Sequence, residues 1–312
     1  MDRIDPLFQA SGFAVLDGGL AIELERRGAD LRDPLWSAKL LFEKPSAIAD
    51  VHRDYLQAGA DIITTASYQA SVPGFMNRGL SRFDAERLLR LSVKLAQDER
   101  DLFWQTRPTN RRRPLVAASV GCYGAFLHDG SEYRGAYGLT LSQLTDWHRD
   151  RLAILVEASP DLLACETIPC LIEAEALSLA LADFPNISAW LSFSCRDELH
   201  LGTGEEFSDA VSIVNDIPNA IAVGVNCTAP WLIEPLLCSA QAIARKPFVV
   251  YPNLGESWNS PSHRWIGDAT SESDWNGRAT RWYGAGARLI GGCCRTTPAI
   301  IQQIARCRDA IR

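Results

Sequence analysis

The sequence predicts an α/β fold, a single-domain (β/α)8 barrel of the TIM-barrel type. Short apolar or β-branched runs alternate eight times with stretches of helical periodicity along the 312 residues. Composition does not change between these units, and barrels of this kind are the main fold that extends one domain to about 250 residues or more. We therefore expect residues 1–312 to form one domain.

The expected strands are nearly continuous apolar runs, as in parallel strands that are buried on both faces. They cover residues 13–17, 61–67, 115–121, 161–167, 189–195, 220–227, 248–253 and 288–293. The alternative is a doubly wound open sheet. That fold does not require eight units, and the first run lacks the Gly-x-Gly-x-x-Gly turn of a dinucleotide site.

A stretch with helical spacing follows each expected strand, and Asp, Ser or Thr lies near most of the starts. The expected helices cover residues 45–59, 81–95, 140–158, 172–182, 207–215, 231–244, 272–283 and 298–311. Two connections are long, at residues 122–139 and 254–271. Long connections in a compact domain are usually lids or binding loops.

Charge and hydropathy exclude several classes of partner. The chain has 31 basic and 38 acidic residues and a net charge of −7, whereas nucleic-acid backbones are bound by clustered Lys and Arg. No apolar run approaches the roughly 20 residues of a membrane-spanning helix. The first residues do not resemble a secretory signal. We expect a cytoplasmic protein without nucleic-acid or membrane partners, and the sequence leaves the oligomeric state open.

Three of the nine cysteines lie at the carboxyl ends of expected strands, where barrels of this type place their chemistry. Cys227 ends the sixth strand, and Cys293 and Cys294 follow a pair of glycines at the end of the eighth. Three thiolates with one open position are the ligand pattern of a catalytic zinc, and sulfur ligands select zinc over magnesium or calcium. The alternative is that all three are buried apolar cysteines.

Two carboxylates lie at the same end of the predicted barrel. Asp17 ends the first strand and Glu166 ends the fourth. Either residue alone can be a helix cap or one half of an ion pair. Together, beside a metal that binds a thiol, they can hold an ammonium group. The two carboxylates and the metal describe a site for an amino acid with a thiol in its side chain.

Several longer motifs share these positions. They include Leu16-Asp17-Gly18-Gly19, Gly130-Ser131-Glu132-Tyr133-Arg134-Gly135, Leu163-Ala164-Cys165-Glu166-Thr167, Gly224-Val225-Asn226-Cys227 and Gly291-Gly292-Cys293-Cys294-Arg295-Thr296-Thr297-Pro298. With these motifs the chain resembles the homocysteine S-methyltransferases, from about residue 13 to residue 305. It is most similar to the branch that uses S-methylmethionine. It departs from the family at Gly19, where relatives often carry Ala, and residues 257–271 match poorly.

The resemblance implies seven site residues. The implied zinc ligands, which are also the catalytic residues, are Cys227, Cys293 and Cys294. The residues implied to bind homocysteine or line its pocket are Asp17, Glu166, Asn226 and Tyr68. The implied reaction is zinc-dependent methyl transfer from a sulfonium donor, S-methylmethionine or S-adenosylmethionine, to the thiol of L-homocysteine, which gives methionine.

Two alternatives remain open from the sequence. A selenocysteine methyltransferase would use the same ligands, because sulfur and selenium acceptors bind zinc alike. A zinc- or thiol-binding protein without methyl transfer would also bring the cysteines together. No Cys-x-x-Cys redox motif supports this second class, and it gives the carboxylates no role. Trp36, Trp258 and Trp265 offer aromatic faces for a sulfonium cation, or they pack within the barrel and its loops.

Overall fold

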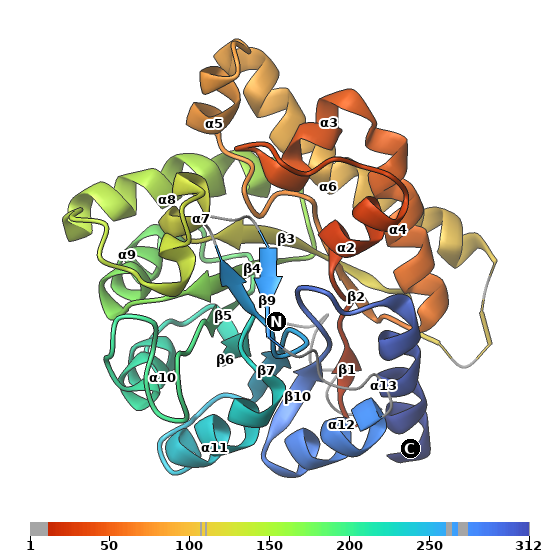
Figure 1. The fold of residues 1–312 in the computed structure, drawn as a ribbon, viewed down its shortest axis with the longest axis vertical. Helices are drawn as coiled ribbons and strands as arrows, with labels where there is room; N and C mark the ends of the chain where they lie inside the picture. The colour runs from red at the N-terminus through yellow and green to blue at the C-terminus, as the bar shows by residue number, and fades with distance from the viewer. Residues whose placement is uncertain (1–11, 107, 110, 260–263, 268–273, 312) are drawn as a thin grey trace.

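The chain forms a ring of parallel strands surrounded by helices (Figure 1). The computed structural model describes residues 12–106, 108–109, 111–259, 264–267 and 274–311. The eight strands are hydrogen-bonded in the order β1-β10-β7-β6-β5-β4-β3-β2. A parallel bridge between Leu16 and Ile62 brings the start of the ring beside its end. The predicted (β/α)8 barrel is therefore confirmed.

The eight strands of the ring coincide with the eight predicted runs. They are β1 (Ala14–Val15), β2 (Ile62–Thr64), β3 (Leu115–Gly121), β4 (Leu162–Ile168), β5 (Ala189–Phe193), β6 (Ala220–Asn226), β7 (Phe248–Tyr251) and β10 (Ala287–Ile290). All except the third and fourth are shorter than predicted. As a result Asp17, Cys293 and Cys294 lie in turns beyond the strand ends, where the backbone is free to aim their side chains at the axis of the ring.

One long helix follows each strand of the ring. These helices are α4 (Pro45–Ala58), α6 (Arg82–Gln105), α8 (Leu141–Glu157), α9 (Leu171–Leu181), α10 (Phe207–Asn215), α11 (Pro230–Ala240), α12 (Trp275–Gly284) and α13 (Pro298–Ile311). Thr140 and Gln143 form a capping box at the start of α8. Gly59 ends α4 with φ of 114°, a left-handed conformation that favours glycine. Among the helices described, none has the length and apolar character needed to cross a bilayer.

The long connections carry short elements that the periodicity did not predict. Those before α4, between β2 and α6, and between β3 and α8 are α2 (Leu20–Arg26), η1 (Trp36–Lys39), α3 (Leu40–Glu43), α5 (Val72–Asn77), α7 (Tyr123–Leu127) and η2 (Ser131–Tyr133). After β7 the chain forms an antiparallel hairpin, β8 (Ser257–Asn259) with β9 (Arg264–Ile266). The side chains of Trp258 and Trp265 are outside the described part of the structure.

Alternation along the strands divides the core into two layers. Leu162, Ala164 and Leu289 belong to a cluster inside the ring, together with Trp190 and Tyr251. The residues between them along the strands pack instead against the helices, in a second and larger cluster. Because Glu166 follows Leu162 and Ala164 at two-residue spacing, its side chain belongs to the inner layer. The strand register thus directs this carboxylate into the mouth of the ring.

Gly224→Ala is expected to destabilise the barrel strongly. A Cβ atom at Gly224 would lie 1.8 Å from the carbonyl oxygen of Val249 on the neighbouring strand, and neither strand can move freely. Overpacking of this kind costs about 3 kcal/mol or more of unfolding free energy. Denaturant unfolding measures this loss. Gly284→Ala is the control, because no described atom lies within 4 Å of its new Cβ. Equal stability of the two variants would contradict the prediction.

Candidate active site

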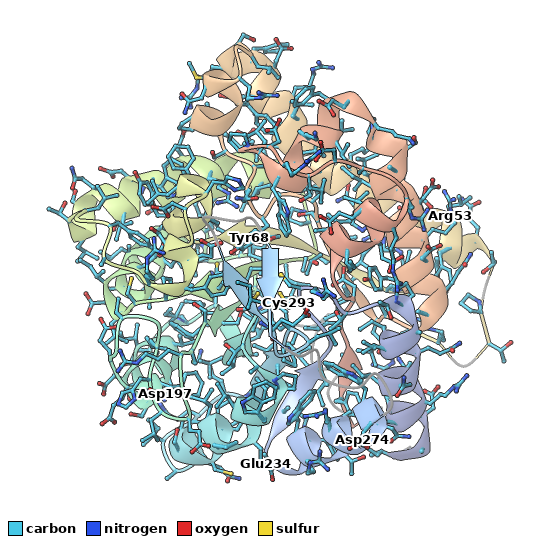
Figure 2. The ribbon with its side chains drawn as sticks, in the orientation of Figure 1. Arg53, Tyr68, Asp197, Glu234, Asp274 and Cys293 are labelled. Carbon is cyan, nitrogen blue, oxygen red and sulfur yellow. The ribbon has the colours of Figure 1, made fainter. Side chains whose placement is uncertain are left out.

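The carboxyl ends of the strands surround a cavity of about 430 Å³. Six of the seven predicted site residues line it: Asp17, Tyr68, Glu166, Cys227, Cys293 and Cys294. Figure 2 shows the labelled Tyr68 and Cys293 near the centre of the ring, whereas Arg53 and Asp197 lie at its periphery. The fold thus brings residues from both ends of the sequence to one opening.

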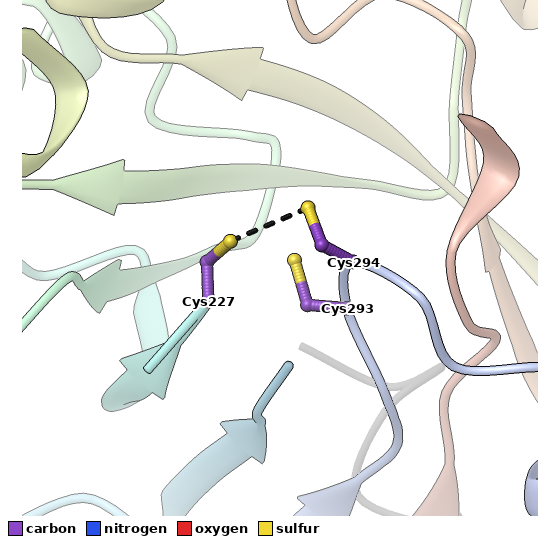
Figure 3. Close-up of side chains that lie close together, drawn as sticks. All are labelled: Cys227, Cys293 and Cys294. Carbon is purple, nitrogen blue, oxygen red and sulfur yellow. Dashed lines mark hydrogen bonds between the residues drawn. The ribbon is translucent and has the colours of Figure 1, made fainter. Parts of the chain in front are cut away.

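The three cysteines converge at this opening (Figure 3). Their Sγ atoms all lie within 4.8 Å of one another, and those of Cys227 and Cys294 are 3.5 Å apart. In a tetrahedral zinc site with Zn–S bonds of about 2.3 Å, two sulfur ligands are about 3.8 Å apart. The observed spacing therefore fits a tetrahedral metal with three sulfur ligands. All nine cysteines of the chain are free thiols.

Strand β7 sets the distance between the ligand-bearing segments. The Cys227 amide donates to the carbonyl of Tyr251 at 3.1 Å, and the Cys293 amide donates to the carbonyl of Pro252 at 2.8 Å. Cys227 has φ of 49°, a left-handed conformation that is uncommon outside glycine. Strained backbone of this kind persists only where the surrounding structure imposes it. Main-chain hydrogen bonds to β7 and Pro252 therefore fix the backbone at Cys227 and Cys293.

Neighbouring donors favour a thiolate at Cys227. Hydrogen bonds from Cys293 and Cys294 lower the pKa of the Cys227 thiol well below its ordinary value, against the opposing effect of burial. The hydroxyl of Tyr133 contributes in the same direction, with its oxygen 3.1 Å from the Cys227 Sγ. A thiolate is the form that binds metals.

Asp17 is buried and held by a neighbouring strand. Its Oδ2 accepts from the Thr64 amide at 2.7 Å, and the Thr64 hydroxyl lies 3.0 Å from its Oδ1. Burial raises the pKa of Asp17 from 3.8 to about 8, although the Thr64 hydrogen bonds lower it; the charge of Glu166 raises it further. The carboxylate is thus positioned, but none of its main influences among the described residues is a positive charge that would stabilise its ionised form.

Glu166 is the second buried carboxylate of the cavity. The Ser119 hydroxyl donates to its Oε1, and Tyr251 is a further hydrogen-bond partner. Burial raises the pKa of Glu166 to about 7, and these hydrogen bonds only partly oppose it. The two carboxylates influence each other electrostatically. Two carboxyl groups of this kind in one cavity match a ligand that brings positive charge.

The two remaining predicted residues occupy different places. Tyr68 lines the cavity and meets Trp36 edge-on, with ring centroids 6.3 Å apart. Asn226 is fully buried and does not line the cavity. Its Oδ1 accepts from the Thr167 amide and its Nδ2 donates to the Thr167 hydroxyl, both at 2.8 Å. Thr167 has φ of 60° and does line the cavity, so Asn226 fixes a strained wall residue.

The cavity also contains Glu132 and Tyr133, which the sequence reasoning did not assign. Both lie on η2, inside the long connection after β3. A signal was present, because they belong to the motif at residues 130–135 that carried part of the resemblance. Burial raises the pKa of Glu132 to about 7.

The glycine at position 19, where the sequence departs from the family, is explained by close packing. A Cβ atom there would lie 2.8 Å from the Cys293 carbonyl oxygen.

A buried carboxylate anchors this connection to the outer helices. Glu173, on α9, accepts from the Tyr123 amide and, at 2.9 Å, from the Tyr137 hydroxyl. Its Oε1 also lies 2.9 Å from Nε2 of His148, on α8, and both side chains are fully buried. The connection that carries Glu132 is therefore held at both of its ends.

Fold and site together define a class: a parallel (β/α)8 barrel with a three-thiol centre and paired carboxylates at the carboxyl ends of its strands. The family model described as homocysteine S-methyltransferase matches residues 14–308. The chain belongs to this family.

Individual relatives agree with this assignment. The chain is 47% identical to homocysteine S-methyltransferase YbgG of Bacillus subtilis, over 98% of this chain and 97% of the relative. It is 46% identical to homocysteine S-methyltransferase 1 of Zea mays, over 97% and 96%. The crystal structure of the metallated homocysteine methyltransferase MmuM of Escherichia coli superposes with a TM-score of 0.87 at 41% identity, covering 97% of this chain and 99% of that one.

Proposed function

We propose that this protein is a zinc-dependent methyltransferase that transfers a methyl group from a sulfonium donor to the thiol of L-homocysteine and produces methionine. One observation supports this most directly: three thiols converge in a cavity that also contains two buried carboxylates. The relatives are named for the same acceptor, and one solved relative is described as metallated.

In this proposal Cys227, Cys293 and Cys294 hold Zn²⁺ and leave one coordination position for the acceptor sulfur. Zinc, when bound, keeps the homocysteine thiol deprotonated at neutral pH. Asp17 and Glu166 bind the acceptor ammonium between them. The cysteine site would thereby hold the sulfur end of the acceptor and the two carboxylates its ammonium end, which orients the acceptor sulfur toward the donor methyl group.

The surrounding residues support that orientation. Thr64 and Ser119 hold the two carboxylates, and Tyr133 donates to the thiolate of Cys227. Tyr68 and Trp36 form an aromatic wall that a sulfonium cation can contact, at about 0.5–2 kcal/mol for each favourable contact. Asn226 keeps Thr167 in its wall position. No separate general base is needed for the thiol.

The function is tested by methionine formation from homocysteine with S-methylmethionine or S-adenosylmethionine, before and after removal of zinc. Turnover that disappears with the metal and returns on adding it back supports the proposal. Selenocysteine as acceptor is assayed in parallel, because the same thiols would bind a selenolate. A zinc-storage protein would bind one metal and show no turnover with either donor.

We further propose that residues 1–312 form one homocysteine-binding domain.

The affinity for an amino-acid ligand is expected to rise between pH 6 and pH 8. Asp17 keeps its proton up to about pH 8 in the ligand-free protein, whereas an ammonium ion binds the ionised carboxylate. Methionine is a suitable probe, because it has the ammonium group but no thiol proton. Calorimetry in buffers of different ionisation enthalpy should show proton release on binding at pH 7. An affinity that falls over this range would contradict the assignment of Asp17.

The same group gives a stability prediction of definite sign. The folded pKa of Asp17, about 8, lies above its ordinary value of 3.8, so the folded state binds more protons between these values. The unfolding free energy of the ligand-free protein therefore falls as pH rises through this window. Asn at position 17 has no proton to release, so the unfolding free energy of the Asp17→Asn variant should fall less steeply over this pH range.

A further inference from the structure

We propose that Glu132 binds the cationic methyl donor by placing its carboxylate beside the sulfonium centre. This inference rests on the proposed function and adds a donor-binding residue to it. Glu132 lies in the same cavity as the three thiols but on a different segment from Asp17 and Glu166.

The first observation is a buried carboxylate oxygen without a partner. Oε2 of Glu132 is inaccessible to solvent and has no hydrogen-bond partner in the part of the chain that the structure describes. Its own amide and the charge of Arg134 stabilise the ionised form of Glu132, whereas Asp17 and Glu166 accept hydrogen bonds from residues on neighbouring strands. Leaving a buried carboxylate oxygen unpaired is costly. The positive charge of a sulfonium ligand in the cavity would compensate this oxygen electrostatically.

The second observation is the proximity of Glu132 to the thiols. The next residue, Tyr133, places its hydroxyl oxygen 3.1 Å from the Sγ of Cys227. Glu132 interacts electrostatically with Cys227 and with Cys294. The main influences on the Asp17 carboxyl group, in contrast, include no cysteine, and the one side-chain charge among them is that of Glu166. Glu132 is therefore placed near the position where the methyl group is transferred.

The backbone of Glu132 is firmly held. Its carbonyl oxygen accepts from the Ser194 hydroxyl at 2.8 Å. A Cβ on Gly124 would lie 2.4 Å from its amide nitrogen, so η2 packs directly on the backbone of α7. A carboxylate on a fixed backbone acts as a preorganised charge.

Charge changes in the reaction define what this carboxylate can do. The acceptor sulfur forms a new bond to the methyl carbon. The bond from that carbon to the donor sulfur breaks, and its electron pair stays on the donor sulfur, which becomes a neutral thioether. A negative charge beside this sulfur therefore stabilises the bound donor more than the product. Such an interaction acts on donor KM and does not raise kcat, because the positive charge is already declining in the transition state.

The test compares Glu132→Gln with the wild-type zinc-loaded protein, using S-methylmethionine and S-adenosylmethionine as separate donors. We expect donor KM to rise by about 10- to 100-fold, as for the loss of a close partner of opposite charge. Homocysteine KM and zinc content should stay within about twofold of wild type. The melting temperature should stay within about a few degrees of wild type. Glu132→Asp should recover part of the donor affinity. Glu175→Gln is the control, since Glu175 is exposed on α9 and does not line the cavity.

Other outcomes overturn the inference. Unchanged donor KM in Glu132→Gln, or equal increases in donor and homocysteine KM, would exclude a donor-specific role. A fall in kcat alone would also exclude it. These results differ from a failure of the proposed function, in which the wild-type protein itself shows no turnover with either donor.

Discussion

A Cys294→Ala variant is expected to lose both its zinc and its methyl-transfer activity. With this thiol removed, Cys227 and Cys293 offer two of the three converging sulfur atoms, and the 3.5 Å contact between Cys227 and Cys294 is absent. Replacing a residue that only supports a metal ligand lowers affinity or activity by about 10- to 100-fold, so loss of a ligand itself should exceed 100-fold. Metal analysis and methionine formation measure the two effects.

Cys238→Ala is the matched control for this experiment. Cys238 is also a free thiol but lies exposed on α11, away from the cavity. This variant should keep the wild-type metal content and activity. Normal zinc content and turnover in Cys294→Ala would rule out the three-thiol site. Thermal unfolding of the zinc-free proteins shows whether the substitution has damaged the fold.

Asp17→Asn is expected to weaken homocysteine binding by roughly 30-fold or more. The substitution keeps the size of the side chain and leaves an oxygen for the Thr64 amide, but it removes the charge that the ammonium group would meet. Breaking a buried, hydrogen-bonded charge pair costs about 2–5 kcal/mol, which corresponds to this loss or a larger one. The measurement is homocysteine KM at saturating donor, with donor KM determined separately.

The selectivity of this effect is its control. Donor KM and zinc content should remain close to wild type in Asp17→Asn, and Glu175→Gln, at an exposed position on α9 outside the cavity, should leave all three quantities unchanged. A homocysteine KM within about twofold of wild type would show that Asp17 does not bind the acceptor ammonium. A parallel rise in donor KM would indicate a general distortion of the cavity.

The barrel could be predicted from the sequence because its signals are local and repeated. Each buried strand appears as an apolar run, and each outer helix has its own spacing and caps, as at Thr140 and Gly59. The convergence of Cys227 with Cys293 and Cys294 followed from the same repetition, since strand ends of a parallel barrel meet at one opening. Family resemblance supplied the roles of these residues, which spacing alone left open.

Residues in the connections could not be placed in the same way. Glu132 and Tyr133 lie in a segment without regular periodicity, so only the folded chain shows that they enter the cavity. Asn226 adjoins a predicted ligand in sequence, yet both polar atoms of its side-chain amide are hydrogen-bonded to Thr167. That difference depends on the left-handed backbone at Thr167, and no sequence pattern of this chain signals it.

The position of β7 between the two cysteine-bearing segments has a consequence for the biogenesis of the protein. Cys227 and Cys294 are 67 residues apart, and β10 is the last strand of the ring along the chain, where it pairs with β7 and with β1. A nascent chain therefore cannot assemble the complete thiol centre until its final strand has left the ribosome. In the proposed zinc enzyme, metal capture would then favour the closed ring over any open sheet, because a ligand that binds only the folded form stabilises that form.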